Sequence, residues 1–129
     1  MTIETEIRTR LLADGTISGL IVARAYPLLL PENPTYPALV FSRVSGERLH
    51  NLAGVAGRGF PRITISSWAA SYAGAQALGA AVRASLDGFN GLLTTMKAVI
   101  KIENEIDDYD ETVKKYRLIQ DYLCSHPET

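Results

Sequence analysis

Six carboxylates lie close together in the last third of the sequence, and their chemistry would suit a divalent cation. They fall within nine consecutive positions that hold no basic residue, as Glu103, Glu105, Asp107, Asp108, Asp110 and Glu111. Hard cations bind carboxylate oxygens, but alternate residues on the wet face of a strand lie about 7 Å apart, too far to share one ion easily. The spacing also misses the calcium-loop pattern, which needs a glycine at its sixth position. We therefore expect an acidic face that is solvated or repels like charges, rather than a metal site.

A glycine-rich stretch invites a phosphate-binding interpretation. The sequence Gly-Val-Ala-Gly-Arg-Gly over 54–59 places Arg58 between two glycines. Phosphate loops direct backbone N–H groups at the ligand from a loop that opens a helix. Here a strand is predicted next, and no Gly-Lys-Ser or Gly-Lys-Thr follows. Two interpretations stay open for this stretch: a flexible connection, or a segment that becomes ordered on contact with a partner.

The ingredients for nucleophilic catalysis are incomplete. Cys124 stands two residues before His126 near the C-terminus, and His50 stands alone in the glycine-rich region. A serine or cysteine nucleophile needs a histidine base and an orienting acid. The sequence holds neither a Gly-x-Ser-x-Gly motif nor a paired set of histidines for zinc. We therefore do not expect an enzyme.

Composition describes one ordinary domain. The chain has 129 residues, 47% hydrophobic and 21% charged, with 13 Lys+Arg against 14 Asp+Glu. That length predicts a single domain over 1–129 with its own core, and the net charge of −1 gives no electrostatic reason to expect nucleic-acid binding. One cysteine excludes an internal disulfide. No targeting segment or membrane span is visible, so we expect synthesis in the cytoplasm.

The N-terminal half is predicted to hold one helix and two strands. Apolar residues at every fourth position from Ile3 to Leu11 predict an amphipathic helix that ends near Gly15. Four prolines within eleven positions exclude regular structure from the next loop, and four glycines suggest a mobile second loop. The elements after the helix are a strand over 20–26, a proline-rich extended loop over 27–37, a strand over 38–45 and a long mobile connection over 46–61.

The C-terminal half carries the clearest periodicities. Ser71 is a suitable N-cap for an alanine-rich helix over 72–86, and the Asn90-Gly91 pair indicates a turn. Apolar residues then alternate with charged ones up to Ile106, which predicts a strand with one wet face. The remaining predicted elements are a strand over 62–66, a polar turn over 108–112, a last strand over 115–124 and a flexible tail over 125–129. The order α-β-β-β-α-β-β predicts an α+β fold: a largely antiparallel sheet of about five strands with two helices on one face.

Two further features could form surfaces. Leu28, Leu29 and Leu30 lie inside the proline-rich loop; either the loop folds back on the core as a lid or it docks on another subunit. Trp68 and the six tyrosines could in principle stack on single-stranded nucleic acid, but they are scattered along the chain rather than interleaved with bases. Packing in the core and on the surface is the better interpretation for them.

The order of these segments resembles the tail completion, or tail terminator, family of long-tailed bacteriophages, over about Ile3 to Tyr122. The most specific part of the resemblance is Trp68-Ala69-Ala70-Ser71-Tyr72, which leads into the alanine-rich helix. The other matching segments are Leu11-Leu12-Ala13-Asp14-Gly15, Ala25-Tyr26-Pro27, Pro37-Ala38-Leu39-Val40-Phe41-Ser42-Arg43-Val44-Ser45-Gly46, Val82-Arg83-Ala84-Ser85-Leu86-Asp87-Gly88, and Tyr116-Arg117 beside the acidic turn.

The resemblance implies structural work in the virion. Members of that family cap the head-proximal end of the tail tube as a six-fold ring, stop tube polymerisation and present a surface to the head connector. It implies copies of this chain, the tube protein and the head-tail connector or stopper as partners, with no cofactor and no membrane. Candidate contacts with subunits or the tube are Leu28, Leu29, Leu30, Arg48, His50, Arg58 and Phe60. Glu103, Glu105 and Asp107 are candidates to line a channel through which DNA passes without specific binding, because like charges repel.

Three alternatives remain. Another head-tail interface component, such as a stopper or adaptor, is the nearest in function and is poorly separated by sequence. A small-molecule-binding regulatory domain could share an α+β sheet of this size and would show a defined apolar pocket. An enzyme is the weaker rival, because nucleophile and metal ligands are missing.

Overall fold

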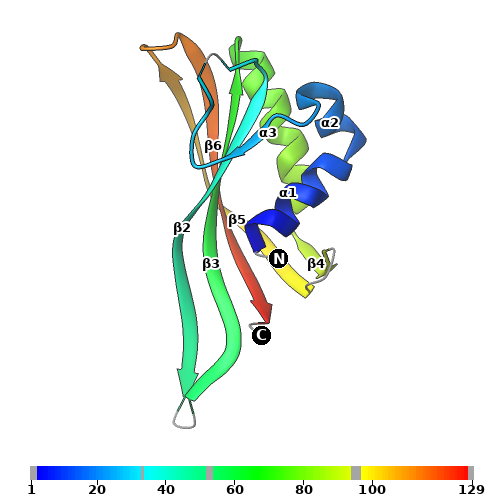
Figure 1. Cartoon of the computed structure of the whole chain (residues 1–129), viewed down its shortest axis with the longest axis vertical. Coiled ribbons are helices and arrows are strands. Elements are labelled where there is room, and N and C mark those ends of the chain that lie inside the picture. The colour runs from blue at the N-terminus through cyan, green and yellow to red at the C-terminus, as the bar shows by residue number, and fades with distance from the viewer. Residues whose placement is uncertain (1–2, 33, 52–53, 94–96, 128–129) are drawn as a thin grey trace.

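The computed structural model describes residues 3–32, 34–51, 54–93 and 97–127; at residue 3 and over 44–51, 54–61 and 126–127 it describes the backbone alone. Within these ranges, three helices lie on one face of a six-stranded sheet (Figure 1). The expected α+β class is confirmed, with one helix and one strand more than the pattern predicted. None of the helices described is long and apolar enough to span a membrane.

Two helices, rather than one, open the chain. α1 (Ile3–Ala13) is followed at once by α2 (Gly15–Ile21), because Asp14 caps the second helix. Its carboxylate accepts hydrogen bonds from the backbone N–H of Thr16 at 2.9 Å and of Ile17 at 3.3 Å. The strand expected over 20–26 is therefore wrong in its first part, and only β1 (Ala25–Pro27) is extended. A short apolar run fits a buried helix as well as a strand, and here the cap favours the helix.

The sheet has the strand order β1-β2-β3-β6-β5-β4. β1 is parallel to β2 (Ala38–Asn51), and every other neighbouring pair is antiparallel, which confirms the largely antiparallel sheet. The other strands are β3 (Gly54–Ala69), β4 (Phe89–Leu92), β5 (Lys97–Asp110) and β6 (Lys115–Pro127).

The long mobile connection expected over 46–61 is wrong. Its described residues belong to β2 and β3, which pair from Gly46 opposite Pro61 out to Asn51 opposite Gly54. We call this part of the two strands, residues 44–51 and 54–61, the hairpin arm; it projects beyond the helices at the bottom of Figure 1. Glycines are weak strand formers, but pairing along the whole length outweighs local propensity. Two bulges, between Arg43 and Ser45 and between Arg48 and His50, interrupt the register.

Two other boundaries differ from the sequence pattern. Asn90 and Gly91 do not form a turn but lie in β4, opposite Val99 and Ala98. The chain reverses earlier, at Gly88, whose φ of 77° suits glycine. At the C-terminus, β6 runs to Pro127 and its end pairs with β3. Residues 125–127, expected in a flexible tail, are therefore in the sheet.

α3 (Tyr72–Leu86) matches the predicted helix, with Ser71 as its N-cap. The helix lies very close to the sheet at Gly79, where an added Cβ would fall 2.1 Å from Cδ2 of Leu118. The core fills the space between the helices and one face of the sheet. Its largest fully buried side chains are Ile7, Leu11, Ile17, Ile21, Leu39, Ile63, Ile65, Leu78, Leu86, Ile100 and Tyr122. We call the covered side of the sheet the helix face and the opposite side the outer face.

Candidate interaction surfaces

A β-bulge divides the acidic residues of β5 between the two faces of the sheet. Ile102 pairs with Tyr122, whereas Asn104 already pairs with Asp121, so Glu103 is an extra residue. Side chains that alternate along a strand change face at such an insertion. The single wet face expected for Glu103, Glu105 and Asp107 is therefore wrong. The same bulge leaves Ile106, expected on the apolar face, 49% exposed.

Glu103 lies on the outer face. Its carboxylate pairs with the guanidinium of Arg62 at 2.8 Å, and both side chains are partly exposed. Other ion pairs and hydrogen bonds share this face, among them Thr64 with Asp121 at 2.7 Å. By strand alternation, the described charges on the outer face are Arg62, Lys97, Lys101, Lys115 and Arg117 against Glu103, Asp108, Asp110 and Asp121. The outer face is thus close to neutral rather than acidic.

Glu105 lies on the helix face and ties α3 to the sheet. It accepts two hydrogen bonds from Nη1 of Arg83, at 2.8 and 2.9 Å, and one from Nε2 of Gln120 at 2.8 Å. The buried Gln120 also donates to the backbone carbonyl of Gly79 at 3.0 Å and accepts from the hydroxyl of Tyr122 at 3.2 Å. Burial raises the pKa of Tyr122 above its usual range, so this hydroxyl is a donor at neutral pH. The network makes Glu105 a structural residue of the α3 contact.

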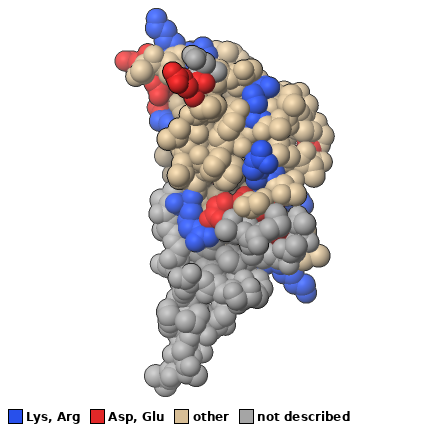
Figure 2. Space-filling model, viewed as in Figure 1, with Lys and Arg blue, Asp and Glu red and all other residues tan. Residues whose placement is uncertain are grey.

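Asp107 has the same role nearer the N-terminal end of α3. It accepts a hydrogen bond from the hydroxyl of Tyr72 at 2.9 Å and another from the amide of Gln76. The carboxylate raises the pKa of the Tyr72 hydroxyl, because the hydrogen bond favours the protonated phenol. Two of the three acids proposed for a channel therefore hold the helix in place. Figure 2 shows acidic and basic side chains together at the end of the molecule that carries the β5–β6 turn.

The leucines of the proline-rich loop form an exposed lip beside a cavity. Leu28 and Leu29 are 74% and 70% exposed, and Leu30 is half-buried. Leu28 adopts a φ of 68°, unusual for a residue with a side chain, while its N–H donates to the carbonyl of Phe41. Of the two interpretations, a lid on the core does not fit the exposure of the first two leucines. The cavity, of about 710 Å³, is lined by Glu4, Thr5, Arg8, Ala25, Tyr26, Pro27, Leu28, Phe41, Ser42 and Arg43.

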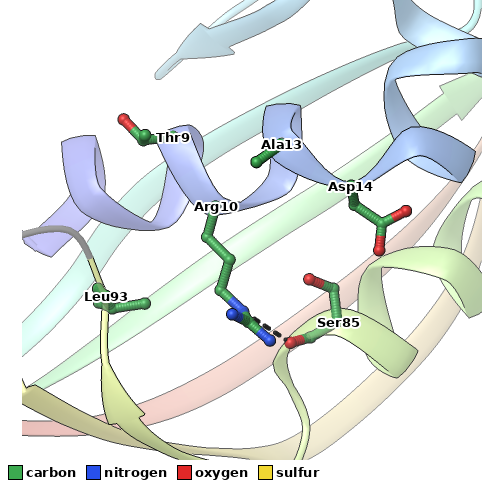
Figure 3. Close-up of a pocket in the computed structure, with 6 residues that line it drawn as sticks. All are labelled: Thr9, Arg10, Ala13, Asp14, Ser85 and Leu93. Carbon is green, nitrogen blue, oxygen red and sulfur yellow. Dashed lines mark hydrogen bonds between the residues drawn. The ribbon is translucent and has the colours of Figure 1, made fainter.

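A second, smaller cavity of about 330 Å³ lies between α1 and the end of α3. Figure 3 shows Arg10 reaching from α1 across it toward Ser85, whose backbone carbonyl accepts a hydrogen bond from Nε at 3.0 Å. The guanidinium also lies over the ring of Phe89, 4.1 Å from its centroid. Both interactions are internal, so Arg10 fastens α1 to the α3–β4 turn.

Aromatic residues that are far apart in the sequence meet at the end of the sheet opposite the hairpin arm. On the helix face, the ring of Tyr116 lies 4.8 Å from Tyr109 and 6.1 Å from Tyr72, between centroids. On the outer face, Trp68 is covered by Tyr36 and by the guanidinium of Arg117, which lies 5.0 Å from its ring. The scatter along the sequence concealed this grouping, because the topology brings together four aromatic residues near strand or helix ends and Tyr36, which precedes β2.

Of the residues considered for catalysis, Cys124, His126 and His50, the described side chains include that of Cys124 alone. Cys124 is fully buried in the core, and burial raises the pKa of its thiol to about 12. Arg48 and His50 are on β2, and Arg58 and Phe60 are on β3, but their side chains lie outside the described parts. No group of His, Cys, Asp and Glu that could hold a metal ion occurs among the residues that the structure describes.

Comparison with known proteins agrees with this architecture. The family model of the tail completion protein gp17 matches residues 5–123. A chain from the structure titled "Virion of native gene transfer agent (GTA) particle" is similar in fold, with a TM-score of 0.75 and 17% sequence identity over 97% of this chain and 94% of that one. No curated protein sequence matches. Since the family model spans nearly the whole sequence, the chain belongs to the tail completion protein gp17 family and is a structural protein of the bacteriophage virion, at the junction of head and tail.

Proposed function

We propose that this protein caps the head-proximal end of the tail tube as a six-fold ring, stops tube polymerisation there and joins the tail to the head connector. The family match over residues 5–123 supports the head–tail role. The observation that carries the capping role is the presence of unlike exposed surfaces on one small domain, since a closed head-to-tail ring needs two different faces on each subunit. The hairpin arm, whose backbone is seen in Figure 1, the leucine lip and the aromatic end are such surfaces.

The contacts with subunits or the tube are proposed to involve the leucine lip and the hairpin arm. Leu28 and Leu29 expose apolar area that a partner would cover, and Leu30 stands beside them. On the arm, the residues concerned are Arg48, His50, Arg58 and Phe60. The partners are other copies of this chain, the tube protein and the connector or stopper. No cofactor and no catalytic step belong to this proposal.

DNA is proposed to pass through the ring without specific binding. Because of the bulge, Glu103 lies on the outer face, while Glu105 and Asp107 hold α3 on the helix face. Of the three acids, Glu103 is therefore the one proposed to line the channel. Glu103→Lys therefore tests the channel without disturbing the helix. We expect slower DNA ejection with normal rings and tails. Loss of the ring in this variant would show that the side chain of Glu103 serves the contact between copies rather than a channel lining.

Electron microscopy of particles from the parent virus or prophage with this gene deleted tests the whole proposal. We expect overlong or ragged tails beside filled, tailless heads, and rescue by the gene in trans. Tails of normal length attached to heads would refute tail termination. Normal-length tails separated from filled heads would indicate a stopper or adaptor role instead.

A further inference from the structure

Among the described residues, β2 and β5 each have one edge that a neighbouring strand covers only in part. β1 covers β2 only from Leu39 to Phe41, so the edge of β2 is open from Ser42 to Asn51. β4 covers β5 only from Lys97 to Ile100, and the N–H of Ile102 donates to the side chain of Asp87. Beyond that point the edge of β5 is open, from Glu103 to Asp110. Open edges expose unsatisfied N–H and C=O groups and readily pair with another strand.

The open edge of β2 begins at the larger cavity. Phe41, Ser42 and Arg43 line the cavity from β2, and Tyr26, Pro27 and Leu28 line it where β1 stops. The space thus lies where a strand would continue past the end of β1. The lip of Leu28 and Leu29 stands beside it, with most of its apolar surface in solvent. A strand entering here would gain both backbone partners and apolar contact.

The two open edges are suited to each other in direction and position. Strands β2, β3, β6 and β5 alternate in direction across the sheet, so β5 of one copy and β2 of the next would pair antiparallel in a continuous sheet. The open stretches lie toward opposite ends of the sheet (Figure 1). When a sheet closes around an axis, its strands tilt and neighbouring strands are staggered along the axis. In a ring of copies with tilted strands, this stagger would bring the open stretch of β5 in one copy beside the open stretch of β2 in the next.

Charge favours the same pairing. The β2–β3 hairpin over 42–62 carries four arginines against Glu47; Arg43 and Arg62 are paired within their own subunit with Glu4 and Glu103, and the other two are Arg48 and Arg58. The open stretch of β5 over 103–110 carries five carboxylates and no base. Glu103, Glu105 and Asp108 are neutralised by arginines of their own subunit, which leaves Asp107 and Asp110 without a cationic partner among the described contacts. The basic hairpin of a second copy would supply one.

We propose that the open edge of β5 (103–110) of one copy adds to the open edge of β2 (42–51) of the next, and that this antiparallel strand pairing holds the ring together. The inference rests on the proposed function, since it names the contact between copies within the proposed ring. It predicts a head-to-tail contact in which the two edges are different, and neither edge meets its own equivalent.

Cysteine cross-linking on assembled rings tests this pairing. Ser42→Cys marks the outer face of β2, and Ile106→Cys or Asn104→Cys marks the outer face of β5. Each variant is assembled with purified tail tubes, checked for rings by electron microscopy and treated with a short bismaleimide, which tolerates a register error of a residue or two. The native Cys124 is buried, and the unsubstituted protein shows its background. Ala80→Cys, on the exposed side of α3, is the matched control.

We expect covalent dimers when the Ser42→Cys and Ile106→Cys proteins are mixed, none from either protein alone, and a ladder of oligomers from the double variant. Rings that form on tubes but give no mixed dimer would overturn the pairing and leave the capping role intact. Dimers from a single variant would overturn it in favour of a symmetric contact. Cross-links from Ser42→Cys to the tube protein would assign the β2 edge to the tube. Tubes that carry no ring at all would refute the proposed function itself.

Discussion

Replacing Gly79 by alanine tests how closely α3 approaches the sheet. The new Cβ would lie 2.1 Å from Cδ2 and 3.2 Å from Cγ of Leu118. Leu118 is buried, so its side chain cannot move into solvent. Either the leucine leaves its rotamer or the helix moves away from β6. Movement of the helix would also stretch the 3.0 Å hydrogen bond from Gln120 to the carbonyl of Gly79.

Two opposing effects set the size of the change. Alanine is favoured over glycine in a helix interior by about 1 kcal/mol. Overpacking a core costs about 1–3 kcal/mol, and weakening a buried hydrogen bond adds about 1 kcal/mol. We therefore expect Gly79→Ala to lower the free energy of unfolding by about 1–3 kcal/mol, against the direction of helix propensity.

Urea unfolding followed by the fluorescence of the single tryptophan, Trp68, measures this change. Ala80→Gly, at an exposed position of the same helix, calibrates the propensity effect and should cost about 1 kcal/mol. In a Leu118→Ala background the clash is removed, so Gly79→Ala should become neutral or stabilising. A Gly79→Ala protein that is more stable than the unsubstituted chain would refute the close approach of α3.

Three further outcomes are expected. Asp14→Ala removes the cap of α2 and should lower the free energy of unfolding by about 1 kcal/mol in urea titrations. Thr16→Ala is a control that leaves the cap in place, and an Asp14→Ala protein as stable as the unsubstituted chain would contradict the cap. Cys124 should react with a thiol reagent at pH 8 only after unfolding, because burial raises its pKa to about 12, and fast labelling of the folded chain would contradict its position in the core. The Arg117 guanidinium lowers the pKa of Asp108 below its ordinary 3.8. The pair therefore stabilises the fold above pH 3.8, and this stabilisation is lost as the pH falls through the lowered pKa. Asp108→Asn should reduce the pH dependence of the free energy of unfolding at the acid end, as measured by urea unfolding, and an unchanged pH dependence would contradict the pairing.

The sequence was sufficient for elements whose signals are local. Ser71 and the apolar stripe of α3 predicted that helix to the residue, and the alternation after residue 96 predicted β5. The α+β class followed from the order of such elements. Leu28 and Leu29 were singled out because apolar residues in a proline-rich loop need an explanation, and the structure leaves them exposed.

The errors come from contacts that local pattern does not encode. The hairpin arm was read as a loop because its glycines are poor strand formers, while its order comes from pairing between two distant strands. The aromatic end needed the topology to bring Trp68, Tyr72 and Tyr109 to one end of the sheet. The bulge at Glu103 carries no glycine or proline to mark it, and it decides on which face every following side chain lies.

That bulge also limits how this chain can be compared with its relatives. Glu103 is one residue more than the opposing strand requires, so a relative without the bulge would be one residue shorter there. An alignment that omits a gap at this position would match residues of opposite faces from Asn104 to Asp110. At 17% identity, such a shift would turn carboxylates that hold a helix into apparent surface charges. Loss of that single residue would remove the bulge and leave Asn104 to Asp110 on their present faces, because Asn104 would then follow Ile102 directly and still lie opposite Asp121.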